Sequence, residues 1–146
     1  MKRFIALFLT GLSLLTFSCI TSKTLNKDVW TLSEILEKNG ELVSVNDLLE
    51  IKNQNIPYIS FYDNNEAKGF SGVNLITMKY ALDEKNNGLS FQEGISTLAL
   101  GTEAENHLES LYKEHLHNTV KFRLENKMLT LCSSEGKALM IFKSAK

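Results

Sequence analysis

One segment of this chain has the periodicity of an amphipathic helix, and the segments around it alternate as short strands. From Glu103 to about Leu116, apolar side chains recur along one stripe at roughly 100° per residue, formed by Ala104, Leu108, Leu111 and Tyr112. Thr102, followed three residues later by Glu105, predicts a capping box at the start of this helix. Because the strand-like segments come in runs, the sequence predicts an α+β domain. Its sheet is expected to be mainly antiparallel, curled and barrel-like, with one principal helix.

Alternating apolar residues predict the strands, and Asn-containing turns such as Asn86-Asn87-Gly88 separate them. A short helical turn is expected after Asn46. The final strand is apolar throughout, which predicts a central place in its sheet. The expected strands cover residues 29–33, 59–62, a segment ending near 70, 78–82, 89–91, 120–124, 128–132 and 138–142.

The N-terminus has the layout of a bacterial lipoprotein signal peptide. Lys2 and Arg3 introduce a 14-residue apolar run from Phe4 to Phe17, and Ser18-Cys19 closes it. A transmembrane helix needs about 20 apolar residues, and this run is shorter and contains polar positions. Thr16 is a departure, because the lipoprotein pattern usually has Leu there. The sequence predicts that the thiol of Cys19 is lipidated and that Cys19 becomes the mature N-terminus.

This prediction divides the chain into three parts: a signal peptide (1–18), a lipidated N-terminus with a short tether (19–27) and one domain (28–146). Removal of the signal takes the chain from 146 to 128 residues and its net charge from −1 to −3, because two cations and no acid are lost. That length suits a single domain. The slightly acidic balance, without a block of Lys or Arg, argues against nucleic acid as a partner. Cys132 would be the remaining Cys and is expected in the core.

An ordered set of short pieces resembles the META domain family, which includes the HslJ-type heat-shock lipoproteins. Each piece is common alone, and their order and spacing from Asp28 to Lys143 carry the resemblance. The pieces are Trp30-Thr31-Leu32, Ile59-Ser60-Phe61, Phe70-Ser71-Gly72-Val73-Asn74, Gly88-Leu89-Ser90-Phe91, Ile95-Ser96-Thr97, the helix with Glu105 and Leu111, Leu129-Thr130-Leu131 and Leu139-Met140-Ile141-Phe142.

The resemblance implies a small, mostly antiparallel domain with one principal helix and a role in envelope stress or adhesion. It implies no catalytic residues. The family commonly carries one Cys in a Gly-Cys-Asn turn and another shortly after the Ser-Thr segment. Here Val73 and Gly101, or a neighbour of Gly101, stand in those places. If the two family cysteines are linked, Val73 is expected to hold its place by burial.

The histidines are the strongest metal candidates, but their spacing does not favour a site. His107, His115 and His117 lack the companion ligands of known zinc motifs, so no metal and no cofactor is expected. His115 falls within the apolar stripe, which predicts a partly buried, hydrogen-bonded ring. His117 is expected in solvent. No nucleophile elbow or phosphate-binding loop occurs in the sequence, and we expect the protein not to be an enzyme.

Two aromatic residues form a candidate binding surface. Tyr58 and Tyr62 alternate with Ile59 and Phe61, so they are expected on the opposite face of their strand. If that face is exposed, the two tyrosines are candidates for contact with a partner. The alternative is a sheet that is packed on both sides and buries them.

The sequence therefore predicts a membrane-anchored lipoprotein that acts as a non-enzymatic envelope-stress, structural or partner-binding module. Its expected partners are the membrane, through acyl chains on Cys19, and an envelope protein. Ile20 is not acidic, which favours the outer membrane, with the domain facing the periplasm or the cell surface. The alternative function is a small-molecule carrier or inhibitor. Its pocket in the curled sheet would be lined by Met78, Tyr80, Phe91 and Phe122.

Overall fold

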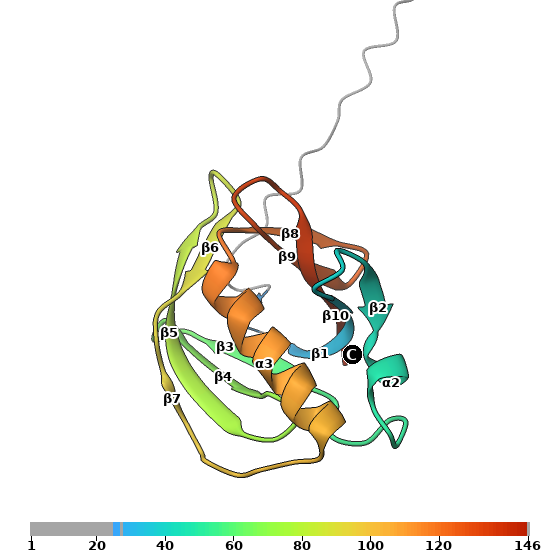
Figure 1. Ribbon diagram of the computed structural model, residues 1–146. Coiled ribbons are helices and arrows are strands. Elements are labelled where there is room, and N and C mark those ends of the chain that lie inside the picture. The colour runs from blue at the N-terminus through green and yellow to red at the C-terminus, as the bar shows by residue number, and fades with distance from the viewer. Residues whose placement is uncertain (1–24, 27, 146) are drawn as a thin grey trace, which may run out of the picture.

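The computed structural model describes residues 25–26 and 28–145. The expected signal peptide, Cys19 and most of the tether lie outside the described residues. The described chain forms a closed, antiparallel barrel with one main helix, which confirms the predicted fold class (Figure 1). The barrel strands are β1 (Val29–Leu36), β3 (Tyr58–Tyr62), β4 (Glu66–Phe70), β5 (Leu75–Asp83), β6 (Gly88–Phe91), β8 (Lys121–Glu125), β9 (Met128–Cys132) and β10 (Ala138–Ser144).

Two further strands and two helices complete the described chain. The short strand β2 (Leu42–Ser44) pairs with β1, and β7 (Ile95–Ser96) pairs with β5. A single helical turn, α2 (Val45–Leu48), follows β2, and the principal helix is α3 (Glu103–Asn118). None of the helices among these residues is long and apolar enough to cross a membrane.

The first and last strands close the barrel by pairing with each other. Trp30 lies opposite Ser144 and Ile35 opposite Met140 in the antiparallel β1–β10 ladder. Because β10 also pairs with β9, both of its edges are occupied, as the apolar sequence of this strand predicted. The ladder between β6 and β8 is the shortest of the barrel, with the single residue pair Gly88 and Lys121.

The barrel is filled by side chains that alternate inward along the strands. Trp30, Phe61, Phe122 and Phe142 are all buried in its interior, and the ring of Phe61 meets that of Tyr80 edge-on at 5.1 Å. The indole Nε1 of Trp30 donates to the carbonyl of Leu25 at 3.1 Å. The core therefore depends on packing, and its largest ring also holds the segment that precedes the first strand.

Leu25 and Asn26 belong to the folded domain, although the sequence analysis placed them in the tether. Leu25 is fully buried in the core. The amide of Asn26 donates to Asp63 at 2.6 Å, and the hydroxyl of Tyr80 donates to Asn26 at 3.3 Å. The folded domain therefore includes residues before Asp28.

Helix α3 crosses one opening of the barrel (Figure 1). Its buried stripe includes Leu108, Leu111 and Tyr112, as predicted from the periodicity. The hydroxyl of Tyr112 donates to the carbonyl of Tyr58 at 3.0 Å, and burial raises the pKa of this phenol. The predicted capping box is present: Thr102 Oγ1 accepts from the amide of Glu105 at 3.3 Å, and the Glu105 carboxylate accepts from the amide of Thr102 at 2.8 Å.

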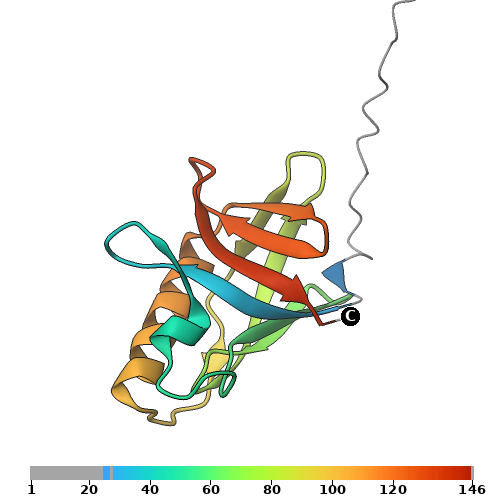
Figure 2. The same ribbon diagram turned by 90° about the vertical axis from the view of Figure 1, so that its right-hand side faces the viewer.

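The chain enters the barrel at one end, and helix α3 starts at the other. Asn26 is bonded to Asp63, which lies in the β3–β4 turn; we call this end proximal. Strand β4 then runs away from that turn over five residues, roughly 17 Å of extended chain. It leads to the turn at Ser71–Asn74, which marks the distal end. Figure 2 shows the first described residues and the start of α3 on opposite sides of the barrel.

Replacing Trp30 tests the description of the core. Trp30→Ala is expected to lower the free energy of unfolding by about 3 to 5 kcal/mol, because it leaves a large cavity. It also removes the donor to the Leu25 carbonyl. Trp30→Phe, which keeps most of the apolar volume, should lose distinctly less. Denaturant unfolding of the two variants checks this expectation, and a wild-type midpoint for Trp30→Ala would contradict it.

Candidate functional site

The distal end of the barrel carries an exposed apolar surface, which we call the distal patch. It consists of Leu75, Ile95, Leu98 and Leu100, whose exposed fractions are 57%, 77%, 96% and 93%. Leu75 starts β5 and is bonded through its backbone to Thr97, so the four residues belong to adjacent segments. Large apolar side chains grouped in this way on a surface mark a site of interaction.

The backbone of the loop that carries Leu98 and Leu100 is hydrogen-bonded to one buried side chain. Asn74 is only 3% exposed. Its Oδ1 accepts from Thr97 Oγ1 at 2.8 Å and from the amide of Ala99 at 2.7 Å, and its Nδ2 donates to the Ala99 carbonyl at 3.1 Å. Ala99 is therefore bonded through both of its backbone groups to a side chain 25 residues away. This contact holds the backbone between the two exposed leucines.

Helix α3 contributes a carboxylate to the same hydrogen-bond network around Asn74, which we call the brace of the loop. Glu109 Oε1 accepts from Ser71 Oγ at 2.7 Å, from Asn74 Nδ2 at 2.9 Å and from Lys113 Nζ at 2.9 Å. Burial raises the pKa of this carboxyl, but the hydrogen bonds from Ser71, Lys113 and Asn74 outweigh burial, so the net pKa lies below its ordinary value. The ionised carboxylate thus links the β4–β5 turn, the loop and the helix.

A second contact fixes the far end of the loop. The side chain of Asn106 accepts from the amide of Gly101 at 3.0 Å and donates to its carbonyl at 2.9 Å. Val73 is half-buried, which is less than the burial expected of it, and a Cβ at Gly101 would lie 2.9 Å from Val73 Cγ2. The two positions that the family resemblance associated with cysteines are therefore in contact, and here the contact is apolar.

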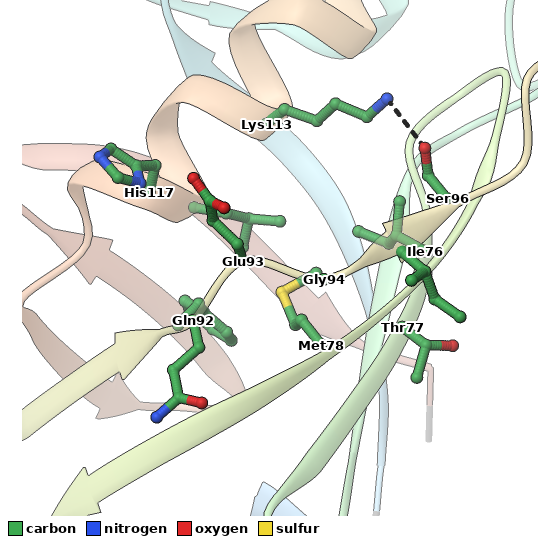
Figure 3. Close-up of a pocket in the computed structure, with 12 residues that line it drawn as sticks. Ile76, Thr77, Met78, Gln92, Glu93, Gly94, Ser96, Lys113 and His117 are labelled. Carbon is green, nitrogen blue, oxygen red and sulfur yellow. Dashed lines mark hydrogen bonds between the residues drawn. The ribbon is translucent and has the colours of Figure 1, made fainter.

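A pocket of about 240 Å³ lies beside the distal patch, between the segment after β6 and the last turns of α3 (Figure 3). Its lining residues are Ile76, Thr77, Met78, Phe91, Gln92, Glu93, Gly94, Ile95, Ser96, Lys113, Leu116 and His117. Met78 and Phe91 were predicted to line a pocket and do so. Tyr80 and Phe122 do not line it, because both side chains are buried in the barrel core. The pocket lies between β5, the segment after β6 and helix α3, beside the barrel core.

The two candidate surface tyrosines lie away from the distal patch. Tyr58 is half-buried, with its ring 6.2 Å from that of Phe70. Tyr62 is exposed beside the proximal turn, and the amine of Lys68 lies 5.4 Å from the centre of its ring. Both point outward because a closed barrel has only one packed face, but their environments differ. The structure does not join them into one aromatic surface.

The three histidines are used separately. His107 Nε2 lies 2.8 Å from Glu37 Oε1, and this partner lowers the pKa of Glu37. His115 is buried as predicted, with Nε2 2.7 Å from the carbonyl of Leu36. His117 is exposed at the mouth of the pocket. Within the described ranges, no group of three or more His, Cys, Asp or Glu side chains is arranged to hold a metal ion.

Cys132, expected in the core, is buried at the end of β9, and burial raises the pKa of its thiol. The protonated thiol is a poor nucleophile. This environment confirms the sequence interpretation of Cys132 as a packing residue.

The sequence analysis missed the distal patch, although a signal was present. Residues 94–102 contain no charged side chain, and Ile95, Leu98 and Leu100 stand among Gly, Ser, Thr and Ala. Apolar residues in an uncharged segment are as typical of a core as of a surface. The exposure of Leu98 and Leu100 follows from the bonds between Asn74 and Ala99, which a pattern of neighbouring residues does not reveal.

A family model of the META domain matches residues 23–146, and the chain belongs to the META domain family. Solved structures share the fold at low identity. An NMR structure of a protein from Burkholderia xenovorans is 19% identical, with a TM-score of 0.66 over 85% of this chain and 86% of that chain. A crystal structure of a DUF4847 family protein from Bacteroides vulgatus is 14% identical, with a TM-score of 0.59 over 83% of this chain and 94% of that chain. No curated protein matches the chain.

Replacing Asn74 tests whether it braces the loop. Asn74→Ala is expected to cost about 3 kcal/mol of unfolding free energy, because it leaves several buried polar groups without partners. The backbone amides of residues 97–101 should exchange with solvent much faster, whereas those of β9 should change only with global stability. Asn118→Ala, at the exposed end of α3, is the matched control and should stay within about 0.5 kcal/mol of wild type. Unchanged exchange at Ala99 in Asn74→Ala would refute the brace.

Proposed function

We propose that this META-domain protein is a lipid-anchored, non-enzymatic binding module of the cell envelope whose distal patch docks on a protein partner. The observation that carries the proposal is the position of the patch. Leu98 and Leu100 are almost fully exposed on a braced loop. The loop that carries them leads into α3, and the start of this helix lies on the side of the barrel opposite the first described residues (Figure 2). A domain tethered at its proximal end would present this patch away from the bilayer.

The anchor follows from Cys19 and from the short segment between it and the domain. The residues from Cys19 to Leu25 span at most roughly 20 Å when extended. Each buried CH₂ of an acyl chain contributes about 0.8 kcal/mol, so dual acylation holds a protein at a membrane stably. Ile20 after the lipidated Cys favours the outer membrane, with the domain facing the periplasm or the cell surface. Leu25, fixed in the core, keeps the proximal end of the barrel next to the bilayer.

The charges around the patch define the chemistry of its partner. Residues 94–102 are uncharged, and the nearest charged residues along the chain are Glu93 and Glu103, followed by Glu105. Lys113, whose amine lies 3.5 Å from Ser96 Oγ, is paired with Glu109. Acidic neighbours disfavour an anionic lipid surface and favour a protein groove that is apolar inside and edged by Lys or Arg. A loop whose backbone is held in place suits insertion of its leucines into such a groove, because little backbone conformational entropy is lost on binding.

The polar groups at the distal end support binding over catalysis. Asn74, Ser71 and Glu109 are engaged with one another and with the loop. Lys113 completes the same set through its ion pair with Glu109. These groups act as a scaffold for the patch, and the family resemblance adds envelope stress as the setting in which such a module would work.

The anchor is tested by intact mass and membrane fractionation of wild type and Cys19→Ala in a bacterial host. We expect wild type to carry an acylated mass and to sediment with membranes, and Cys19→Ala to be soluble. Soluble wild-type protein without acyl groups would contradict the anchor. That result would leave the docking part of the proposal to be judged by its own experiment.

Docking is tested in cells with a photo-crosslinking residue at position 98, and with the same residue at Glu135 in the exposed β9–β10 turn as the control position. A single protein crosslinked only from position 98 is then purified. Leu98→Ser with Leu100→Ser should weaken its binding by at least about 30-fold, as expected for two central apolar contacts. Unfolding free energy should stay near wild type, and Met128→Ser, at another exposed apolar site, should bind normally.

Charge provides the second criterion for the partner. Glu93→Gln with Glu103→Gln should slow association with the purified partner and reduce its dependence on salt. Crosslinks to lipid, or to a second copy of the chain, would contradict the assignment of a protein groove. So would a purified partner whose binding ignores the leucine and glutamate substitutions.

A further inference from the structure

The pocket beside α3 is a second site, separate from the function proposed for the distal patch. Its floor is apolar and continuous with the core: Ile76, Met78 and Leu116 are mostly buried, and Phe91 is half-buried. The volume of about 240 Å³ exceeds that of an engineered apolar cavity of roughly 150 Å³ that binds benzene. The floor therefore has room for one ring or one branched aliphatic side chain.

Gly94 sets the wall of the pocket opposite the helix. A Cβ at this position would collide with the carbonyl oxygen of Thr77 and would lie 2.8 Å from Met78 Cβ. Glycine thus lets the segment after β6 lie directly on β5, which draws it away from α3 and keeps the pocket open between them. Met78, with its flexible thioether, adds a surface that adapts to the shape of an occupant.

The mouth of the pocket carries charges of both signs. Figure 3 shows the amine of Lys113 extending toward Ser96, whereas the carboxylate of Glu93 lies nearer to His117. Lys113 Nζ is 3.5 Å from Ser96 Oγ. Its partner Glu109 also accepts from Ser71 and Asn74, so Lys113 can turn toward a ligand without leaving that carboxylate unpaired.

From this arrangement we propose that the pocket binds a small apolar zwitterion, with the chemistry of an apolar α-amino acid. The side chain of the ligand occupies the floor formed by Ile76, Met78 and Leu116. Its carboxylate meets Lys113, and its ammonium group meets Glu93. A free amino acid and a short peptide with two charged ends share this chemistry, and the test separates them by size.

The test is a titration of the full domain followed by amide chemical shifts in NMR. L-phenylalanine and L-leucine are expected to shift the amides of residues 92–96 and 113–117 in a saturable manner. N-acetyl-phenylalanine amide, which lacks both charges, should bind at least about tenfold more weakly, a difference of about 1.4 kcal/mol. A Phe-Phe dipeptide that binds more tightly than phenylalanine would assign the site to peptides.

Single-charge probes assign each end of the ligand. Glu93→Gln should weaken phenylethylamine about tenfold and leave 3-phenylpropionate unchanged, and Lys113→Met should do the reverse. Glu135→Gln, in the exposed β9–β10 turn, is the matched control and should bind all probes as wild type does. The proposal is overturned if none of the probes shifts these amides, or if capped and zwitterionic probes bind alike.

The leucine substitutions separate the two proposals, although Ile95 and Glu93 border both sites. The Leu98→Ser and Leu100→Ser variant removes the two most exposed residues of the distal patch, and neither residue lines the pocket, so the variant should bind L-phenylalanine normally. Loss of amino-acid binding in that variant, with its fold intact, would contradict the separation of the two sites.

Discussion

The side chain of Asn74 is the polar group on which the distal end of the domain depends. It is buried, and a buried amide without partners is costly, so its position is set by the groups that satisfy it. Those groups belong to two segments that are distant in sequence, the loop after β7 and helix α3, and Asn74 itself lies in the β4–β5 turn. Satisfying one amide therefore fixes three segments together. The exposed leucines and the start of the helix are positioned as a consequence.

This arrangement explains how the domain does without a covalent link at its distal end. Val73 contacts Gly101 at the positions where the family resemblance expects cysteines. An apolar contact of this kind is weak compared with a disulfide. The neighbouring network compensates, because hydrogen bonds to the ionised Glu109 are stronger than those between neutral groups. The site is thus held by packing and charge, and its stability does not depend on the redox state of the compartment.

Local patterns predicted the parts of the fold that local interactions determine. The capping box at Thr102 and the buried stripe through Leu108 and Leu111 involve neighbours within one helix, so the sequence displays them directly. Strand β7 has only two residues and exists because β5 offers an edge at Ile76 and Thr77. Nothing in its own sequence separates it from a loop.

The candidate site was predicted less completely, for the same reason. The outward position of Leu98 depends on the bond between Ala99 and Asn74, and apolar residues in an uncharged segment are as typical of a core as of a surface. The expected pocket was placed inside the sheet because Met78, Tyr80, Phe91 and Phe122 all lie on strands. Closure of the barrel buries Tyr80 and Phe122. The pocket lies instead beside Met78 and Phe91, where the C-terminal half of α3 forms its other wall.

The central claim is that the loop bearing Leu98 and Leu100 is a rigid, outward-facing surface. Backbone ¹⁵N relaxation of the wild-type domain tests it most directly. The account predicts order parameters of about 0.85 for residues 97–101, equal to those of the barrel strands. Values below about 0.6 across this loop would contradict it, because the leucines would then move freely and the network around Asn74 would not hold them.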